Sequence, residues 1–70
     1  MIDIRRKIKT AAAHAGISEA EIARRIESSP QNLSKRLKTG KFTGEELEGI
    51  AAAMGSTLRL DFVFPDGTTI

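Results

Sequence analysis

The sequence predicts a mainly α-helical fold, a small bundle of four to five helices followed by one C-terminal β-strand. Residues 3–55 contain four segments in which apolar residues recur at helical spacing, and each segment opens with a capping residue. After residue 56 the period changes, since residues 57–64 alternate between polar and apolar side chains. We therefore expect a helical domain over residues 1–56 and a strand or hairpin over residues 57–70.

The first helix is expected from Asp3 to Ala15. Asp3 is a suitable N-cap, and Gly16 provides the left-handed residue that commonly ends a helix. Its apolar stripe consists of Ile4, Ile8, Ala11, Ala12 and Ala15.

The second helix opens at Ser18, with Glu21 three residues later. This spacing predicts a capping box, in which the Ser18 hydroxyl and the Glu21 carboxylate each accept a bond from a backbone N–H group. The inward-facing residues are expected to be Ile22, Ala23 and Ile26. The small side chain of Ala23 would let the next helix cross closely, while Arg24 and Arg25 are expected on a solvated face.

The third helix begins at Ser29 as N-cap, with Pro30 at the first helical position, and ends near Thr39-Gly40. Leu33 and Leu37 are its only large apolar residues, so one narrow strip would anchor an otherwise polar helix.

The fourth helix has a second capping box, Thr43 with Glu46, and Gly55 ends it. Phe42 precedes the cap and is expected to pack back against the helix. The apolar positions of the helix are Leu47, Ile50, Ala51 and Met54.

The predicted strand places four large apolar residues on one face: Leu58, Leu60, Phe62 and Phe64. Pro65-Asp66-Gly67 is a turn sequence, and residues 68–70 could begin a return strand. Three residues cannot cover a strand of eight, so the exposed edge must be paired or covered. We expect these four residues to form a dimer interface with the same strand of a second copy. The alternative is a strand that packs flat on the helices of a monomer.

The composition excludes several functional classes. The chain has 70 residues, no cysteine and one histidine, so disulfides and thiolate metal sites are excluded. We expect no metal, no cofactor and no enzymatic activity, because no nucleophile–base pair or ligand cluster is present. No segment approaches the ~20 apolar residues needed to cross a membrane. The charged N-terminus lacks the apolar stretch of a signal peptide, so the expected location is cytoplasmic.

The two halves of the chain differ in charge. Residues 1–41 contain ten Lys or Arg and four Asp or Glu, whereas residues 42–70 contain one Arg and five acids. A basic half suits a polyanionic partner such as a nucleic acid.

The order of the helices, with Gln31-Asn32-Leu33-Ser34-Lys35-Arg36-Leu37-Lys38 in the third, resembles the phage repressor/Cro (XRE-like) helix-turn-helix family. Within that family it is most similar to short bacterial forms that also carry a nearby Phe, here Phe42, and a C-terminal strand. The resemblance covers residues 1 to about 55. It implies a homodimeric, repressor-like regulator of transcription that places its third helix in the major groove of double-stranded DNA.

The site residues follow from chemistry and resemblance together. Gln31 and Asn32 can pair with adenine, and Lys35 can reach guanine. The alternative for Asn32 is a bond to phosphate or backbone. The resemblance adds Pro30 and Ser34 to the residues that face the groove. The expected phosphate contacts, which position the protein without reading sequence, are Ser29, Arg36, Lys38 and Lys41. Arg5, Arg6 and Lys7 would add a weaker attraction or serve only to keep the first helix soluble.

Two features depart from the family. The family often has Gly in the turn between its second and third helices, where this chain has Glu27, so we expect a turn of different geometry. The family also often places Gln at the start of the second helix, where this chain has Glu19, whose charge repels DNA. Glu45 and Glu46 raise the same objection at the fourth helix.

A different class of function is also open. The apolar strand and the acidic C-terminal half are compatible with a protein-interaction module, for example the antitoxin of a toxin–antitoxin pair, in which the strand extends a partner's sheet.

Overall fold

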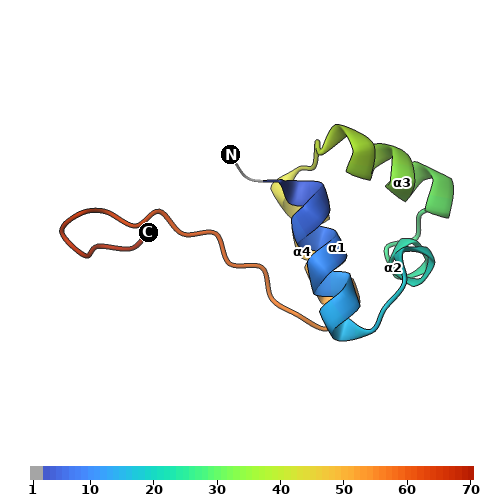
Figure 1. Ribbon diagram of the computed structural model, residues 1–70, viewed down its shortest axis with the longest axis horizontal. Helices are drawn as coiled ribbons and strands as arrows, with labels where there is room; N and C mark the ends of the chain where they lie inside the picture. The colour runs from blue at the N-terminus through green and yellow to red at the C-terminus, as the bar shows by residue number, and fades with distance from the viewer. Residues whose placement is uncertain (1–2) are drawn as a thin grey trace.

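The computed structural model describes residues 3–70, so the first two residues of the predicted domain over residues 1–56 lie outside it. Over residues 3–70 the chain is mainly helical, with almost no strand. The four helices of these residues form one body, from which the C-terminal segment extends (Figure 1). The helices are α1 (Ile4–Ala15), α2 (Glu19–Arg25), α3 (Pro30–Thr39) and α4 (Gly44–Ala53). None of the helices in this part of the chain has the length and apolar character that a membrane crossing requires.

The predicted helix starts are confirmed by their capping bonds. The Asp3 carboxylate accepts a hydrogen bond from the N–H group of Arg6, the third residue of α1. The Ser29 hydroxyl accepts one over 3.1 Å from Asn32, the third residue of α3. At α4 the capping box is complete, since the Thr43 hydroxyl accepts from the Glu46 N–H group and the Glu46 carboxylate accepts from the Thr43 N–H group. Gly16 and Gly40 take positive φ at the ends of α1 and α3. Local sequence therefore determines these boundaries.

The capping box predicted for α2 is only half formed. The Ser18 hydroxyl accepts from the Glu21 N–H group over 3.1 Å, as expected. The Glu21 carboxylate does not return to the cap. It accepts hydrogen bonds from Arg24, at 3.0 Å to Nε, and from Arg25, at 2.8 Å to Nε. Two guanidinium groups within one turn attract the carboxylate more strongly than a single backbone N–H group does.

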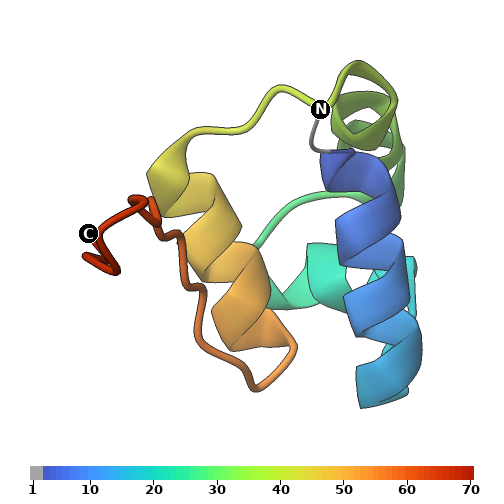
Figure 2. The same ribbon diagram turned by 60° about the vertical axis from the view of Figure 1, so that its left-hand side comes forward.

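The core lies where the helices meet. α3 packs against α2 and α1, and α2 also packs against α4 (Figure 2). Ile22 and Ala23 are fully buried, and Leu33 and Leu37 are 2% exposed. The narrow apolar strip of α3 therefore fits onto α2, where Ala23 adds little volume at the contact. The other buried residues are Ile8, Ala12, Ile50, Ala51 and Ala53.

The turn between α2 and α3 has a left-handed residue. Glu27 has φ of 58°, and it is the only non-glycine residue with positive φ among residues 3–70. The expectation of a different geometry at this position was therefore wrong: the chain keeps the left-handed turn and places a side chain in it. The Ser28 N–H group donates to the Ala23 carbonyl over 2.8 Å and closes the end of α2 in this geometry. A Cβ in the left-handed region costs roughly 1–2 kcal/mol.

The predicted strand over residues 57–64 is not formed. Pairing is confined to the end of the chain, where Phe62 and Ile70 exchange hydrogen bonds and Val63 bridges to Thr69 in antiparallel fashion. The physical reason is the length of the return segment, because residues 68–70 can reach only the last residues before the turn. Residues 57–59 line the groove between α1 and α4, but the segment beyond them does not lie flat on the helices. It runs away from the body and leaves Leu60 71% and Phe62 67% exposed (Figure 1). We refer to residues 57–70 as the arm.

Replacing Glu27 by Gly should stabilise the fold by about 1 kcal/mol, because glycine removes the Cβ that makes the left-handed conformation costly. The measurement is the free energy of unfolding in urea. Glu27→Ala is the matched control: it removes the carboxylate but keeps the Cβ, so stability should change by less than about 0.5 kcal/mol. Equal stabilisation by both variants would show that the charge, and not the backbone, is responsible.

Candidate functional site

The outward face of α3 is polar and exposed. With about 3.6 residues per turn, burial of Leu33 and Leu37 turns Gln31, Lys35 and Lys38 to the opposite side of the helix. Asn32 and Ser34 flank this stripe, and Pro30 is exposed at the first position of the helix. The structure therefore brings all five residues predicted to read bases onto the exposed surface of one ten-residue helix.

These side chains have no bonding partner in the described part of the chain. Across residues 3–70, no hydrogen bond or ion pair engages the side chains of Gln31, Asn32, Ser34 and Lys35. The outward face of α3 thus presents two amides, a hydroxyl and an ammonium group. Their donors and acceptors match the groups that base edges display in the major groove.

Ser29 has a structural role at the start of α3. Its hydroxyl caps the helix by accepting from the Asn32 N–H group, and the residue is half-buried. A hydroxyl that accepts such a bond still has its own O–H to donate, so a phosphate contact is compatible with the cap.

The unpaired cations are concentrated on α3 and at the start of α1. Five cationic residues are held in ion pairs: Lys9, Arg24, Arg25, Arg36 and Arg59. The Lys and Arg residues without an ion pair in residues 3–70 are Arg5, Arg6, Lys7, Lys35, Lys38 and Lys41. Of the predicted phosphate contacts, Lys38 and Lys41 therefore remain available as exposed, uncompensated charges.

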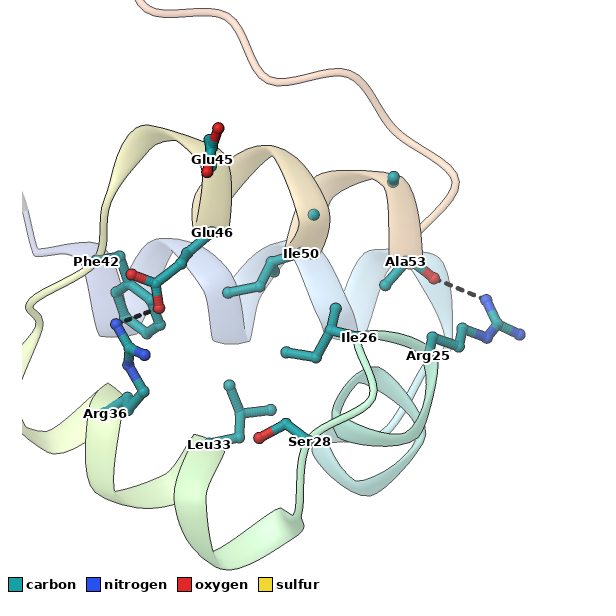
Figure 3. A pocket seen from close by; sticks show the side chains of 12 residues that line it. Arg25, Ile26, Ser28, Leu33, Arg36, Phe42, Glu45, Glu46, Ile50 and Ala53 are labelled. Carbon is teal, nitrogen blue, oxygen red and sulfur yellow. Dashed lines mark hydrogen bonds and ion pairs between the residues drawn. The ribbon is translucent and has the colours of Figure 1, made fainter.

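Arg36 differs from these residues. Its guanidinium turns toward α4, where it forms an ion pair with Glu46 and lies 5.3 Å from the centre of the Phe42 ring (Figure 3). It also donates to the Lys41 carbonyl over 3.3 Å. Arg36, Phe42 and Glu46 all line an open hollow between α3 and α4. The role that Arg36 has in the structure is to brace the loop between the two helices, and sequence alone did not reveal it because Glu46 is ten residues away.

One backbone group and one side chain favour the ionised form of Glu46. The hydrogen bond from the Thr43 N–H group and then the Arg36 guanidinium hold the pKa of the Glu46 carboxyl below its usual range. The acidic start of α4 is therefore partly neutralised by α3 itself. Glu19 at the start of α2 is similarly opposed by Lys9, 3.8 Å away, and Glu45 has no ion pair among the described residues.

Arg5 joins the basic surface of α3. The N-terminus of α1 and the C-terminus of α3 share one hollow, which Asp3, Arg5, Lys38 and Gly40 help to line. From the sequence, Arg5, Arg6 and Lys7 were expected mainly to keep the first helix soluble. The fold separates Arg5 from Lys7, which instead lines the α1–α4 groove on another side of α1. No local pattern could have shown this, because it depends on how α1 crosses α3.

The chain was compared with protein-family models, curated proteins and solved structures, and it matches none of them. We therefore infer what the outward face of α3 can bind from the chemistry of its side chains. Within residues 3–70, no group of three or more His, Cys, Asp or Glu side chains is placed to hold a metal ion. The face offers donors, acceptors and positive charge, which suit base edges and phosphates.

Arg25 ties α2 to α4. Its Nη1 atom donates to the Ala53 carbonyl over 2.7 Å, at the C-terminus of α4 (Figure 3). Its Nε atom donates to the Glu21 carboxylate, which Arg24 also contacts. Arg25 is exposed, as expected for a solvated face, but its guanidinium group also bonds within the protein. The hydrogen bonds from Arg24 and then Arg25 lower the pKa of Glu21 to about 2.

Stability should fall as the pH drops from 4.5 to about 2, because Glu21 stays ionised in the folded state while an unpaired carboxyl takes up a proton near 4.5. Above pH 4.5 the contribution is fully present. In Glu21→Gln this part of the pH dependence should be missing from the free energy of unfolding, measured in urea between pH 6 and pH 2. Glu48→Gln is the control, since Glu48 is exposed and has no ion pair in residues 3–70. A Glu21→Gln curve parallel to that of the wild type would refute this assignment.

Proposed function

We propose that the protein is a sequence-specific DNA-binding regulator of transcription that acts as a homodimer. In this proposal α3 enters the major groove and two copies read a near-palindromic operator. The observation that carries the proposal is the outward face of α3. It holds Gln31, Lys35 and Lys38 in one exposed stripe, without partners in residues 3–70, on a helix whose other side is fixed in the core.

Base reading is assigned to the N-terminal part of α3. The amides of Gln31 and Asn32 can each donate and accept, which suits the N6 and N7 atoms of adenine. Lys35 lies one turn after Gln31 and has the donors to reach the O6 and N7 atoms of guanine. Pro30 and Ser34 would complete the contact surface by shape and by a single hydroxyl bond.

Phosphate binding is assigned to the cations around this stripe. Lys38 and Lys41 lie at and beyond the C-terminal end of α3, and Arg5 lies beside Lys38 across the shared hollow. Their charges would fix the register of the protein on the duplex without reading sequence. The ion pair of Arg36 with Glu46 supports leaving Arg36 out of this set.

The homodimer is supported by the arm. Its apolar residues Leu60, Phe62 and Phe64 are exposed in the single chain, and an exposed apolar surface of this kind marks an interaction site. A domain of 70 residues without disulfides also gains stability by association. Two copies would place their α3 helices in major grooves about 34 Å apart, one turn of the duplex.

The same exposed arm favours one other candidate, a module that binds another protein through its C-terminal residues. Light scattering separates the two. If the arm binds a second copy, the purified chain should have twice its mass of 7.6 kDa. A chain that stays monomeric would favour a different protein as the partner of the arm.

Two α3 variants should separate reading from positioning. Gln31→Ala should relax the preference at one base pair by about 1–3 kcal/mol, whereas Lys38→Ala should weaken binding to all sequences alike. For Lys38→Ala the slope of log K against log salt should flatten by about 0.9. Binding titrations on a selected operator and its single-base variants measure both effects. Wild-type binding by both variants would overturn insertion of α3 into the groove.

The two cations of α1 provide a matched pair. Arg5→Ala should weaken DNA binding and flatten the salt slope by about 0.9, because Arg5 lines the same hollow as Lys38. Lys7→Ala removes the same charge from the α1–α4 side and should leave the slope unchanged. The measurement is the binding constant over a range of salt concentrations. Equal losses from both variants would mean that net charge alone, and not this surface, governs binding.

A further inference from the structure

We propose that two copies of the arm pair edge to edge as antiparallel strands in one register, with Leu60 opposite Leu60 of the second copy. In this register Arg59 of each copy lies opposite Asp61 of the other. The inference rests on the homodimer of the proposed function and identifies the surface that forms it. It does not depend on whether the dimer binds DNA.

The hairpin leaves one backbone edge open. The Phe62 N–H group donates to the Ile70 carbonyl over 2.7 Å, Ile70 returns the bond over 2.9 Å, and the Phe64 N–H group donates to the Thr68 carbonyl over 2.8 Å. The even-numbered residues therefore face the return segment. Because backbone groups alternate along a strand, Arg59, Asp61 and Val63 direct theirs to the other edge. Within residues 3–70 those groups make no backbone hydrogen bond.

The arm has one apolar face that is exposed to solvent. The same alternation places Leu58, Leu60, Phe62 and Phe64 on one face, where Ile70 joins them as the partner of Phe62. All five side chains are exposed in the single chain. An isolated two-stranded hairpin of this kind is marginally stable, and an open edge is a template for another strand. Pairing of two identical edges would join both apolar faces into one.

The charges of the arm select the register. Antiparallel pairing through the open edges sets odd-numbered residues opposite odd-numbered ones, with a two-fold axis at one central residue. A centre at Arg59 would oppose two arginines, and a centre at Asp61 would oppose two aspartates, which is unfavourable. A centre at Leu58 or Phe62 would set the charged residues against uncharged ones. Only the centre at Leu60 opposes Arg59 and Asp61 twice.

The pairing at Leu60 also fits the contacts within each arm. Arg59 Nη2 lies 3.1 Å from Asp61 Oδ2 of the same chain, on the polar face. Across the two-fold axis these pairs would form an alternating set of four charges. On the opposite face Leu58 would lie beside Phe62 of the second copy, and Leu60 beside its own equivalent. The charges therefore favour one register, while the apolar face provides the driving force.

Single cysteines test the register, because the natural chain contains none. We expect Leu60→Cys to form a disulfide-linked dimer under mild oxidation, since directly opposite Cβ atoms lie about 4.5–5.5 Å apart. Leu58→Cys alone and Phe62→Cys alone should not link, because each residue and its equivalent would be about 13 Å apart along the strands. An equimolar mixture of these two variants should link. Non-reducing electrophoresis and mass determination provide the readout.

The outcomes distinguish this inference from the proposed function. Linkage of Leu58→Cys or Phe62→Cys alone, or no linkage at Leu60 in a chain that light scattering shows to be dimeric, would overturn the register. A monomeric chain would overturn the register and the homodimer together. Linkage at Leu60 in a dimer that does not bind DNA would sustain the register while the DNA-binding proposal fails.

A charge exchange tests the same register without cysteine. The double variant R59D/D61R keeps the charge pair within each arm and also pairs correctly with itself. Mixed with wild type, it would set Arg against Arg and Asp against Asp across the interface. After re-equilibration, mass spectrometry should find mixed dimers below the one half that random exchange gives. Mixed dimers at one half would contradict the pairing of Arg59 with Asp61.

Discussion

The packing of α3 onto α2 is the contact on which the rest of the structure depends. α3 has only two large apolar residues, Leu33 and Leu37, and both are buried. A short polar helix of this kind gains most of its stability from tertiary packing and not from intrinsic propensity. The fully buried Ala23 adds little volume at that contact, and the left-handed Glu27 turns the chain so that the helices meet. Because these two leucines fix the rotation of α3, they also decide which of its residues face outward.

Ion pairs then sort the charges of this small protein. Arg25 and Arg36 have contacts that reach α4, one at its C-terminus and one at its first turn. Both are part of the scaffold, although each belongs to the basic half of the sequence. The cations without partners in residues 3–70 lie on α3, just beyond it and at the start of α1. The charge asymmetry of the sequence therefore becomes a more localised basic surface in the fold.

The four helices and their ends could be predicted from the sequence because caps and terminal glycines are local signals. The same reasoning could identify the exposed residues of α3, since burial of Leu33 and Leu37 sets the helical face. It failed where a side chain's contact depends on residues that are distant in sequence, or on several groups that compete for the same side chain. Glu21 binds two arginines instead of the cap, Arg36 turns to Glu46, and Arg5 approaches Lys38 only through the crossing of α1 and α3. The arm has strand periodicity, but a strand also needs a partner, and residues 68–70 provide too short a one.

In the proposed complex, α3 reads DNA from a symmetric pair of copies. The most direct test is selection of bound sequences from a random pool of double-stranded DNA by the purified 70-residue chain. The account predicts enrichment of a near-palindrome whose half-sites lie about 10 base pairs apart, centre to centre, since one turn of the duplex separates the two major-groove contacts. Recovery of no enriched sequence, or of a motif without two-fold symmetry, would contradict it.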